Sequence, residues 1–384
     1  MSDSNRVALT FLKESTYGVT PVGNGQIMRF SSESLKRTAE YGASPEIVSD
    51  GQITDHVLLG IGAAGSINGV LSATTYDTLL ASAMRSSGFA GSATYTASTI
   101  SISSNHLLDS ANGFGSLVVG QYIRTAGFAN ASNNKVLKIT AKTSAGDITV
   151  AGETLVNVAA SPSITITQGS YIENGTTLDS YSIERQNTDI ASMFEVFRGM
   201  FIGSFSLTLA TKRFMEMSLG FQGKDSATFS SEQLGSPTAA SVTDVLNTVA
   251  HVVASYEGGS AASNKIGLTG FSVNVNNNPR SLTELGTLGS TGIGLGSFLV
   301  TGSLELYFKD FTQYTKFLND TYSSFAIVVK DSANKGYVIE LPSIKFQDGE
   351  RVTGGQNQDV VVKLPFGARK DTSLGKTMRI HSIT

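Results

Sequence analysis

Two patterns follow one another in the segment Ile61-Gly-Ala-Ala-Gly-Ser-Ile-Asn-Gly-Val-Leu-Ser-Ala-Thr-Thr-Tyr-Asp-Thr-Leu-Leu-Ala-Ser-Ala-Met84. The first part is rich in glycine and passes into residues that favour a β-strand, whereas the last part places apolar residues at helical spacing. The segment therefore predicts a strand over residues 66–73 that leads into a short helix over residues 76–84.

A related pattern returns late in the chain, in Gly294-Leu-Gly-Ser-Phe-Leu-Val-Thr-Gly-Ser-Leu-Glu-Leu-Tyr-Phe-Lys-Asp-Phe-Thr-Gln-Tyr-Thr-Lys-Phe-Leu-Asn319. Both segments contain a Gly-x-Leu motif, which starts at Gly69 in the first and at Gly302 in the second. In each, an aromatic residue then opens the predicted helix, which covers residues 311–319 in the second segment. The recurrence predicts a duplicated module.

The order of the flanking features supports the duplication. Each copy reads as a strand, a long polar loop, the Gly-x-Leu strand, the helix and further strands, and closes on Phe221-Gln-Gly-Lys-Asp225 or Phe366-Gly-Ala-Arg-Lys-Asp371. From the Gly-x-Leu motif to the closing motif, the first copy is longer than the second by nearly the length of residues 91–176. That stretch has short β-prone runs between Gly, Asn, Ser and Asp residues, which predicts an inserted all-β domain.

Composition restricts the function classes. The 28 basic and 31 acidic residues are nearly balanced, which gives no case for a nucleic-acid-binding surface. The chain has no cysteine, so disulfides, cysteine-ligated zinc and thiol nucleophiles are excluded. No apolar run is long enough to span a bilayer, and the first residues lack a signal-peptide pattern, which predicts a chain made in a cytosol.

Catalytic and cofactor motifs are weak or missing. The run Gly60-Ile-Gly-Ala-Ala-Gly65 fits a dinucleotide-binding pattern literally, but a β-prone segment rather than a helix follows it. We interpret it, and the matching Gly292-Ile-Gly-Leu-Gly296, as turns that require positive φ. The four histidines, at 56, 106, 251 and 381, have no metal-binding spacing. The sequence therefore predicts no enzyme activity, no cofactor and no metal.

The predicted organisation has six parts. They are an N-terminal arm (1–30), a discontinuous first module (31–90 and 177–230), the inserted domain (91–176), a linker (231–264), a second module (265–371) and a C-terminal arm (372–384). Residues 40–60 are expected to form a long polar loop, and residues 190–198 a short helix or turn. Long loops in compact domains are usually functional or ordered by a partner.

Several stretches together resemble the major tail tube proteins of long, non-contractile (siphovirus-type) bacteriophage tails. They are Glu14-Ser-Thr-Tyr-Gly-Val-Thr-Pro21, Met28-Arg-Phe-Ser-Ser-Glu-Ser-Leu35, Pro45-Glu-Ile-Val-Ser-Asp50, the strand at Gly69 and Tyr76-Asp-Thr-Leu-Leu80. The likeness is best over the first 90 residues, and the remainder matches only by pattern. The resemblance implies a mainly β fold, with two tandem tube modules of β-sandwich or barrel type, each with one short helix.

The resemblance also implies a function. Such modules join sideways into rings with a continuous inner barrel, and the rings stack into the hollow tube through which DNA passes. Family rings normally hold six modules, so two modules in one chain imply a homotrimeric ring with pseudo-sixfold symmetry. The implied location is the virion, after assembly in the host cytoplasm. Implied partners are further copies of the chain, the tape measure, terminator and distal tail proteins, and transiently passing DNA, without membrane insertion.

Five charged residues are candidates for contacts between subunits or rings. Glu46, Asp50 and Asp55 cluster in the first long loop without the spacing of a calcium-binding loop, and Arg280 and Glu284 lie in the second. The lumen is expected to be neutral or acidic, because basic side chains would retain phosphates. The inserted domain is expected outside the tube.

One other class of protein remains open from the sequence. A β-rich surface adhesin or virion decoration protein would also have this Gly/Ser/Thr-rich composition and an inserted domain. It would not explain the duplication.

Overall fold

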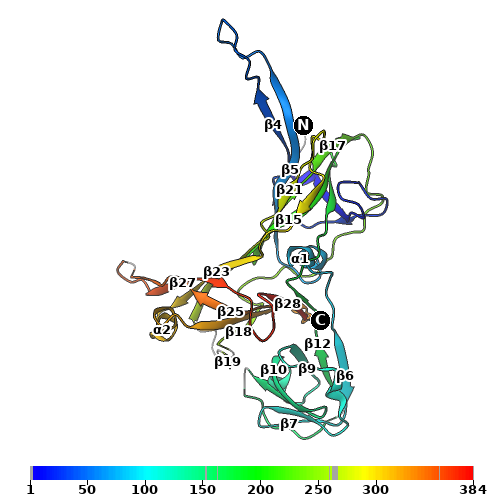
Figure 1. The fold of residues 1–384 in the computed structure, drawn as a ribbon. Coiled ribbons are helices and arrows are strands. Elements are labelled where there is room, and N and C mark those ends of the chain that lie inside the picture. The colour runs from blue at the N-terminus through cyan, green and yellow to red at the C-terminus, as the bar shows by residue number, and fades with distance from the viewer. Residues whose placement is uncertain are drawn as a thin grey trace.

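The computed structural model describes residues 3–151, 154–161, 163–258, 260–261, 267–353 and 355–383. The chain is mainly β, as predicted, with α-helices at α1 (Asp77–Ala83) and α2 (Thr312–Leu318). Short 3-10 turns occur at Ser4–Arg6, Gly113–Ser116 and Ala131–Asn133. Figure 1 shows a projecting hairpin at one end, a small separate sheet at the other, and a larger sheet system between them.

The first repeat, as we name it, holds α1 and the early strands of the large sheet system. In hydrogen-bonded order, its strands run β4–β5–β16–β15–β14–β1, with β2 beside β1, β3 beside β5 and β17 beside β15. Their bounds are β1 (Val7–Lys13), β2 (Gln26–Ile27), β3 (Ser32–Glu33), β4 (Lys36–Ala43), β5 (His56–Val70), β14 (Tyr181–Asn187), β15 (Phe194–Ala210), β16 (Glu216–Gly223) and β17 (Asp225–Phe229).

The second repeat holds α2 and the late strands. Its order is β20–β23–β27–β25–β24–β18, with β26 beside β27 and β28 beside β25. The bounds are β18 (Val252–Glu257), β19 (Ser260–Ala261), β20 (Leu268–Asn276), β21 (Arg280–Leu282), β22 (Gly292–Gly294), β23 (Leu299–Tyr307), β24 (Tyr322–Lys330), β25 (Gly336–Phe346), β26 (Glu350–Val352), β27 (Val361–Ala368) and β28 (Arg379–Ile383).

The two repeats have the same strand order, with a helix at the same place. Both helices span seven residues and begin after an aromatic N-cap, Tyr76 or Phe311. A register shift between Tyr181 and Ile183, where β14 pairs with β15, recurs between Ser323 and Phe325, where β24 pairs with β25. Irregularities of this kind tend to be kept within a fold, so their recurrence supports the duplication.

Strand pairing corrects the alignment of the two repeats. Phe221 of β16 lies opposite Gly65 of β5, whereas Phe366 of β27 lies opposite Gly302 of β23. Since Phe221 and Phe366 open the two closing motifs, Gly65 occupies the place of Gly302. The predicted equivalence of Gly69 with Gly302 was therefore wrong, because a short sequence motif carries no information on which residues pair.

The turn prediction for residues 60–65 was also wrong. These residues lie inside β5, and residues 292–294 form β22. Positive φ is found at Gly65, where it is 154°, but inside a strand rather than in a turn, and an added Cβ there would lie 2.4 Å from the carbonyl oxygen of Ser34. Close approach of two backbones selects glycine here.

Seven strands between residues 93 and 168 form a separate sheet with its own apolar core, which includes Leu107, Phe114, Ile139 and Ile166. Its order is β6–β12–β9–β10–β11–β8–β7. The bounds are β6 (Ala93–Ala97), β7 (Ile100–Ser103), β8 (His106–Asp109), β9 (Tyr122–Ala126), β10 (Val136–Ser144), β11 (Asp147–Ala151) and β12 (Ile164–Gln168). The next strand, β13 (Tyr171–Glu173), pairs with β28 of the large system instead.

Two predictions about local structure were only partly right in the first repeat. The loop expected at 40–60 is limited to residues 44–55, because residues 40–43 and 56–60 belong to β4 and β5 and form a projecting hairpin (Figure 1). The helix or turn expected at 190–198 is a turn only up to residue 192, and residues 194–198 begin β15. Most residues of the outer hairpin strands, 40–43 and 56–60, are exposed, so these strands alternate poorly. The first half of β15 is largely buried on both faces, so its apolar run has no period of two.

The two terminal segments were predicted as arms, but each contributes a strand. In β1, Leu9 and Phe11 are buried against β14, and all of β28 is buried beside β25. The turn after β1 is fixed by the buried carboxylate of Glu14, which accepts hydrogen bonds from the Gly18 and Gly199 amides and the Ser180 and Ser182 hydroxyls. Within the expected linker 231–264, residues 252–257 form β18.

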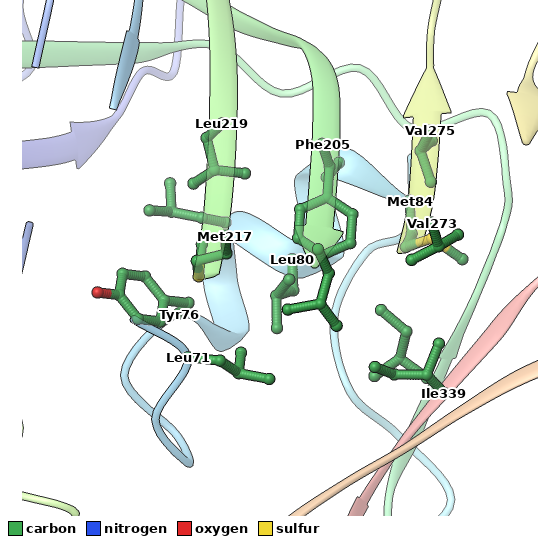
Figure 2. Close-up of a cluster of buried hydrophobic side chains, with 14 of the residues drawn as sticks. Leu71, Tyr76, Leu80, Met84, Phe205, Met217, Leu219, Val273, Val275 and Ile339 are labelled. Atoms are coloured by element: carbon green, nitrogen blue, oxygen red, sulfur yellow. The ribbon is translucent and has the colours of Figure 1, made fainter. Parts of the chain in front are cut away.

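The repeats are joined by a continuous sheet. Residues 204–210 of β15 pair antiparallel with residues 270–276 of β20, so the first repeat continues directly into the second. Helix α1 packs beneath this junction. Figure 2 shows Leu80 and Met84 of the helix among Phe205 from the first repeat and Val273, Val275 and Ile339 from the second, in one buried core.

Candidate functional site

The two repeats share one face of the continuous sheet. Along β15 and β20, residues such as Phe205, Leu207 and Val273 point into the core, and the alternate residues point away from it. These outward residues, here named the polar face, are Ser66 and Asn68 in β5, Ser218, Gly220 and Gln222 in β16, Ser204, Ser206 and Thr208 in β15, Ser272, Asn274 and Asn276 in β20, and Thr301, Ser303 and Glu305 in β23.

Cross-strand hydrogen bonds tie these side chains together. The Ser272 and Ser303 hydroxyls lie 2.9 Å apart, and the Asn68 amide donates to the Ser32 hydroxyl at 2.9 Å. Such pairs stabilise a sheet by about 0.2–1 kcal/mol each. They also leave the face with neutral groups that have little affinity for phosphate.

Charges on this side of the sheet are of both signs, and they include Lys345 of β25, which lies opposite Gly367 and pairs with Asp320 at 2.6 Å. Glu216 lies at the end of β16, and Lys363 of β27 lies opposite Glu305, with 3.5 Å between Nζ and Oε1. Further along, Glu350 of β26 lies opposite Lys363, and Lys36 of β4 lies opposite Ala64. These residues give no basic patch of the kind that holds nucleic acid.

The opposite side of the second repeat carries the small sheet. Tyr122 and Val136 of the small sheet pack against Tyr256, Val328 and Val338, whose side chains point away from the main core. Inside the core, Phe271 of β20 packs against Phe325 of β24 with ring centroids 5.0 Å apart. The polar face on β20 and the small sheet on β24 therefore lie on opposite sides of the second repeat.

A buried ionic network joins the small sheet to the second repeat. Lys138 of β10 contacts Glu340 of β25 at 2.6 Å, and the other Glu340 oxygen lies 3.0 Å from Nε2 of His381. Burial alone would raise the pKa of Glu340, but the hydrogen bond with His381 and the charge of Lys138 together lower it to about 2. The network holds an ionised carboxylate in the interior.

A second polar contact joins the two repeats beside α1. Arg85 is buried and donates to the Asn277 side-chain oxygen at 2.8 Å, to the Asn277 carbonyl oxygen and to the Gly296 carbonyl oxygen at 2.9 Å. The Asn277 amide group in turn donates to the carbonyl oxygens of Ala83 and Ile202. Burial lowers the pKa of Arg85.

The acidic candidates Glu46, Asp50 and Asp55 lie in the exposed tip of the β4/β5 hairpin, which projects from the body (Figure 1). Glu46 accepts a hydrogen bond from the Thr54 hydroxyl at 3.0 Å, and Asp50 accepts one from the Gln52 amide at 3.2 Å. In the part of the chain that the structure describes, no group of three or more potential metal ligands is placed to bind an ion.

Arg280 and Glu284 lie elsewhere, in and beside the β21/β22 ribbon of the second repeat. Both side chains are exposed, while the ribbon folds back on the first repeat of the same chain. There the Ile61 amide donates to the Leu288 carbonyl oxygen at 2.9 Å, and Ser290 hydrogen-bonds to Tyr17 at 2.6 Å. The structure thus separates the five candidates into a projecting hairpin tip and a ribbon between repeats.

Two strand edges were missed by the sequence prediction. Strand β26 pairs with β27 on one side, and β3 and β4 pair with β5 on one side, and no second strand partner is present for them within the described residues. All three residues of β26 are exposed, so no alternation marked this strand in the sequence. An unpaired edge is a ready template for another strand.

No helix within the described ranges is long and apolar enough to cross a bilayer.

The model of a family described as phage tail tube protein matches residues 4–368. No curated protein matches the chain.

Proposed function

The chain belongs to the phage tail tube protein family, and we propose that it polymerises into stacked rings that form the hollow tail tube of a siphovirus-type phage. The match confirms the predicted family and covers the first repeat, the small sheet and the second repeat up to the end of β27. The proposed role is structural rather than enzymatic. It places the protein in the virion, after assembly in the host cytoplasm, with tape measure, terminator and distal tail proteins as its other partners.

The observation that carries this proposal is the polar face, which runs without interruption through both repeats. A face of Ser, Thr, Asn and Gln suits the wall of a conduit, because passing DNA finds few cations that would bind its phosphates. A closed barrel also removes the open strand edges that otherwise promote uncontrolled association. We therefore assign the polar face to the lumen.

The two repeats support a ring of three chains. Since each repeat supplies the same order of strands, one chain takes the place of two single-module subunits. The small sheet lies on the side of the second repeat that faces away from the proposed lumen, and this supports an exterior position for it. The β4/β5 hairpin projects from the body (Figure 1), and we propose that its tip, with Glu46, Asp50 and Asp55, contacts an adjacent ring.

We expect the purified chain to form rings or hollow tubes with threefold symmetry. Electron microscopy with symmetry analysis measures the number of chains in each ring. Six chains per ring would contradict the trimer, and a chain that stays monomeric over a wide concentration range would favour the adhesin or decoration alternative.

Because the chain lacks cysteine, single thiols can report which face is enclosed. In Asn274→Cys the thiol lies on the polar face, and in the matched variant Ser144→Cys it lies on an exposed hairpin of the small sheet. A maleimide coupled to a bulky globular protein is expected to label both variants before assembly, but only Ser144→Cys in long tubes. The labelled fraction is measured on denaturing gels. Rapid labelling of Asn274→Cys in tubes would place the polar face outside and refute the lumen assignment.

A further inference from the structure

The junction inside the chain serves as a template for a junction between chains. Within one chain, the free edge of β15 in the first repeat is covered by β20 of the second. In that register Ser206 lies opposite Asn274, and Thr208 lies opposite Ser272. The equivalent edge of the second repeat and the equivalent of β20 in the first repeat can be identified from strand pairing.

Strand β26 occupies the place of residues 206–208 of β15. Ser218 lies three residues before Phe221 and pairs with Ser206 of β15. Lys363 lies three residues before Phe366, the equivalent of Phe221, and pairs with Glu350 of β26. Glu350 is therefore the equivalent of Ser206, and the outer edge of β26 is the edge that β20 covers in the first repeat.

The equivalent of β20 follows from Gly65 and Gly302. Ser66 follows Gly65, and its carbonyl oxygen accepts a hydrogen bond from the Ser34 amide. Ser303 follows Gly302, the equivalent of Gly65, and pairs with Ser272. Ser34 is thus the equivalent of Ser272, and Lys36 is the equivalent of Asn274. The strand that would cover β26 consists of residues 34–38, at the start of β4.

We propose that β26 of one copy pairs antiparallel with residues 34–38 of a second copy, with Glu350 opposite Lys36 and Val352 opposite Ser34. The proposal rests on the proposed function, which requires a sheet that continues from chain to chain. It names the two edges that meet and their register. Lys36, Glu350 and Val352 are exposed in the single chain, so both edges are accessible to a partner.

Charge complementarity supports this register. Across β23, β27 and β26, three residues on the outward side of the sheet alternate in sign, in the order Glu305, Lys363 and Glu350. Lys36 of the second copy would extend the row with a positive charge. Opposite charges in directly facing positions stabilise a strand pair, and like charges destabilise it, so a slip that placed an acidic residue opposite Glu350 would be disfavoured.

The helices point to the same partner. Helix α1 lies beneath the junction inside the chain, where Tyr76 is 2% and Ala83 0% exposed. In α2, the residues at the same helix positions are Phe311 and Leu318, and these are 56% and 61% exposed. A second copy seated on β26 would cover this helix, as the second repeat covers α1. Exposed apolar side chains beside an open strand edge are expected at such an interface.

The edge at residue 35 is partly protected in the single chain. The Leu35 amide donates to the Glu33 carboxylate at 2.7 Å, and its carbonyl oxygen accepts from Arg185 at 3.2 Å. Side chains that occupy backbone groups oppose premature pairing of an edge strand. In the proposed junction, strand hydrogen bonds replace one or both of these contacts.

A disulfide tests the register. Residues that face each other in an antiparallel pair have Cα atoms about 4.5–5.5 Å apart, which a disulfide can span. We expect Glu350→Cys combined with Lys36→Cys, oxidised after assembly, to shift the non-reducing gel band from monomer to a covalent trimer. The matched pair Glu350→Cys with Ser32→Cys displaces one thiol along the strand and is expected to remain monomeric. Reducing agent should return all bands to monomer.

The outcomes separate the two proposals. Rings or tubes that show no Glu350–Lys36 cross-link, or that cross-link equally through residue 32, would overturn the junction and leave the tube function standing. Failure of the unmodified protein to form rings or tubes would overturn both. Assembly of each double variant under reducing conditions verifies that the substitutions themselves do not block ring formation.

Discussion

Replacing Arg85 with methionine is expected to lower the free energy of unfolding by about 3–5 kcal/mol, because each buried acceptor that loses its donor costs about 1–3 kcal/mol. The substitution removes three donated hydrogen bonds and leaves the Asn277 side-chain oxygen and the Gly296 carbonyl oxygen without this donor. Methionine retains much of the aliphatic volume, so the loss reports mainly the polar contact. Denaturant titration followed by circular dichroism measures the change.

The control for Arg85 is Arg213→Met, because Arg213 is an exposed residue next to the β15–β16 turn. We expect this variant to change stability by less than about 0.5 kcal/mol, as surface substitutions usually do. A loss below about 1 kcal/mol for Arg85→Met would show that the two repeats are held together by the continuous sheet and core alone. Since Arg85 joins the repeats, its loss is also expected to reduce ring formation.

Replacing Glu340 with glutamine is expected to destabilise the protein by about 3 kcal/mol at neutral pH, from the linkage between pKa and stability. The pKa of Glu340 is about 2 in the folded protein, against an ordinary value of 4.5. A lowered pKa means that the folded state binds the proton less tightly than the unfolded state. The stabilisation is therefore fully present above about pH 4.5 and is lost as the pH falls towards 2.

The lowered pKa of Glu340 predicts how the effect of the substitution depends on pH. The difference in unfolding free energy between the native protein and Glu340→Gln should be constant from pH 7 to about 5 and should shrink on further acidification. Chemical denaturation at a series of pH values measures it. The exposed carboxylate variant Glu216→Gln serves as the control and should show a small difference. A difference for Glu340→Gln that persists unchanged at pH 3 would contradict the assigned role of the carboxylate.

Local sequence patterns predicted the parts of the fold that local physics determines. The helix expected over 311–319 is α2 (Thr312–Leu318), and the Gly-x-Leu strand expected at Gly302 is β23 (Leu299–Tyr307). In each case the pattern of apolar residues that gave the prediction lies within the element itself. For α2, the aromatic N-cap directly precedes the helix. The strand-to-helix order at α1 was confirmed for the same reason.

The parts that failed depend on distant partners. Strand β28 became a buried strand only through its pairing with β25 and β13, and β1 through its pairing with β14. The outer part of the β4/β5 hairpin, residues 40–43 and 56–60, is largely exposed in the single chain, so burial imposes little alternation on it. A sequence window cannot contain such long-range information.

The same distinction between local and long-range information applies to the candidate site residues. Charge and loop length placed Glu46, Asp50 and Asp55 at an exposed tip, and their role in contacts between rings or subunits remains a prediction. Lys36 and Glu350 were not singled out, because neither has a distinctive neighbour in the sequence. Their proposed relationship becomes visible only when Gly65 and Gly302 align the two sheets.

The pairing of β15 with β20 has a kinetic consequence for the proposed ring. Half of the sideways junctions form when a single chain folds, at the high effective concentration that a covalent tether provides. Only the other half require a bimolecular encounter, and all of these use the same two edges. The concentration at which tubes nucleate is then governed by one short strand, and a chaperone or terminator that caps β26 would be enough to keep the pool of free chains from polymerising.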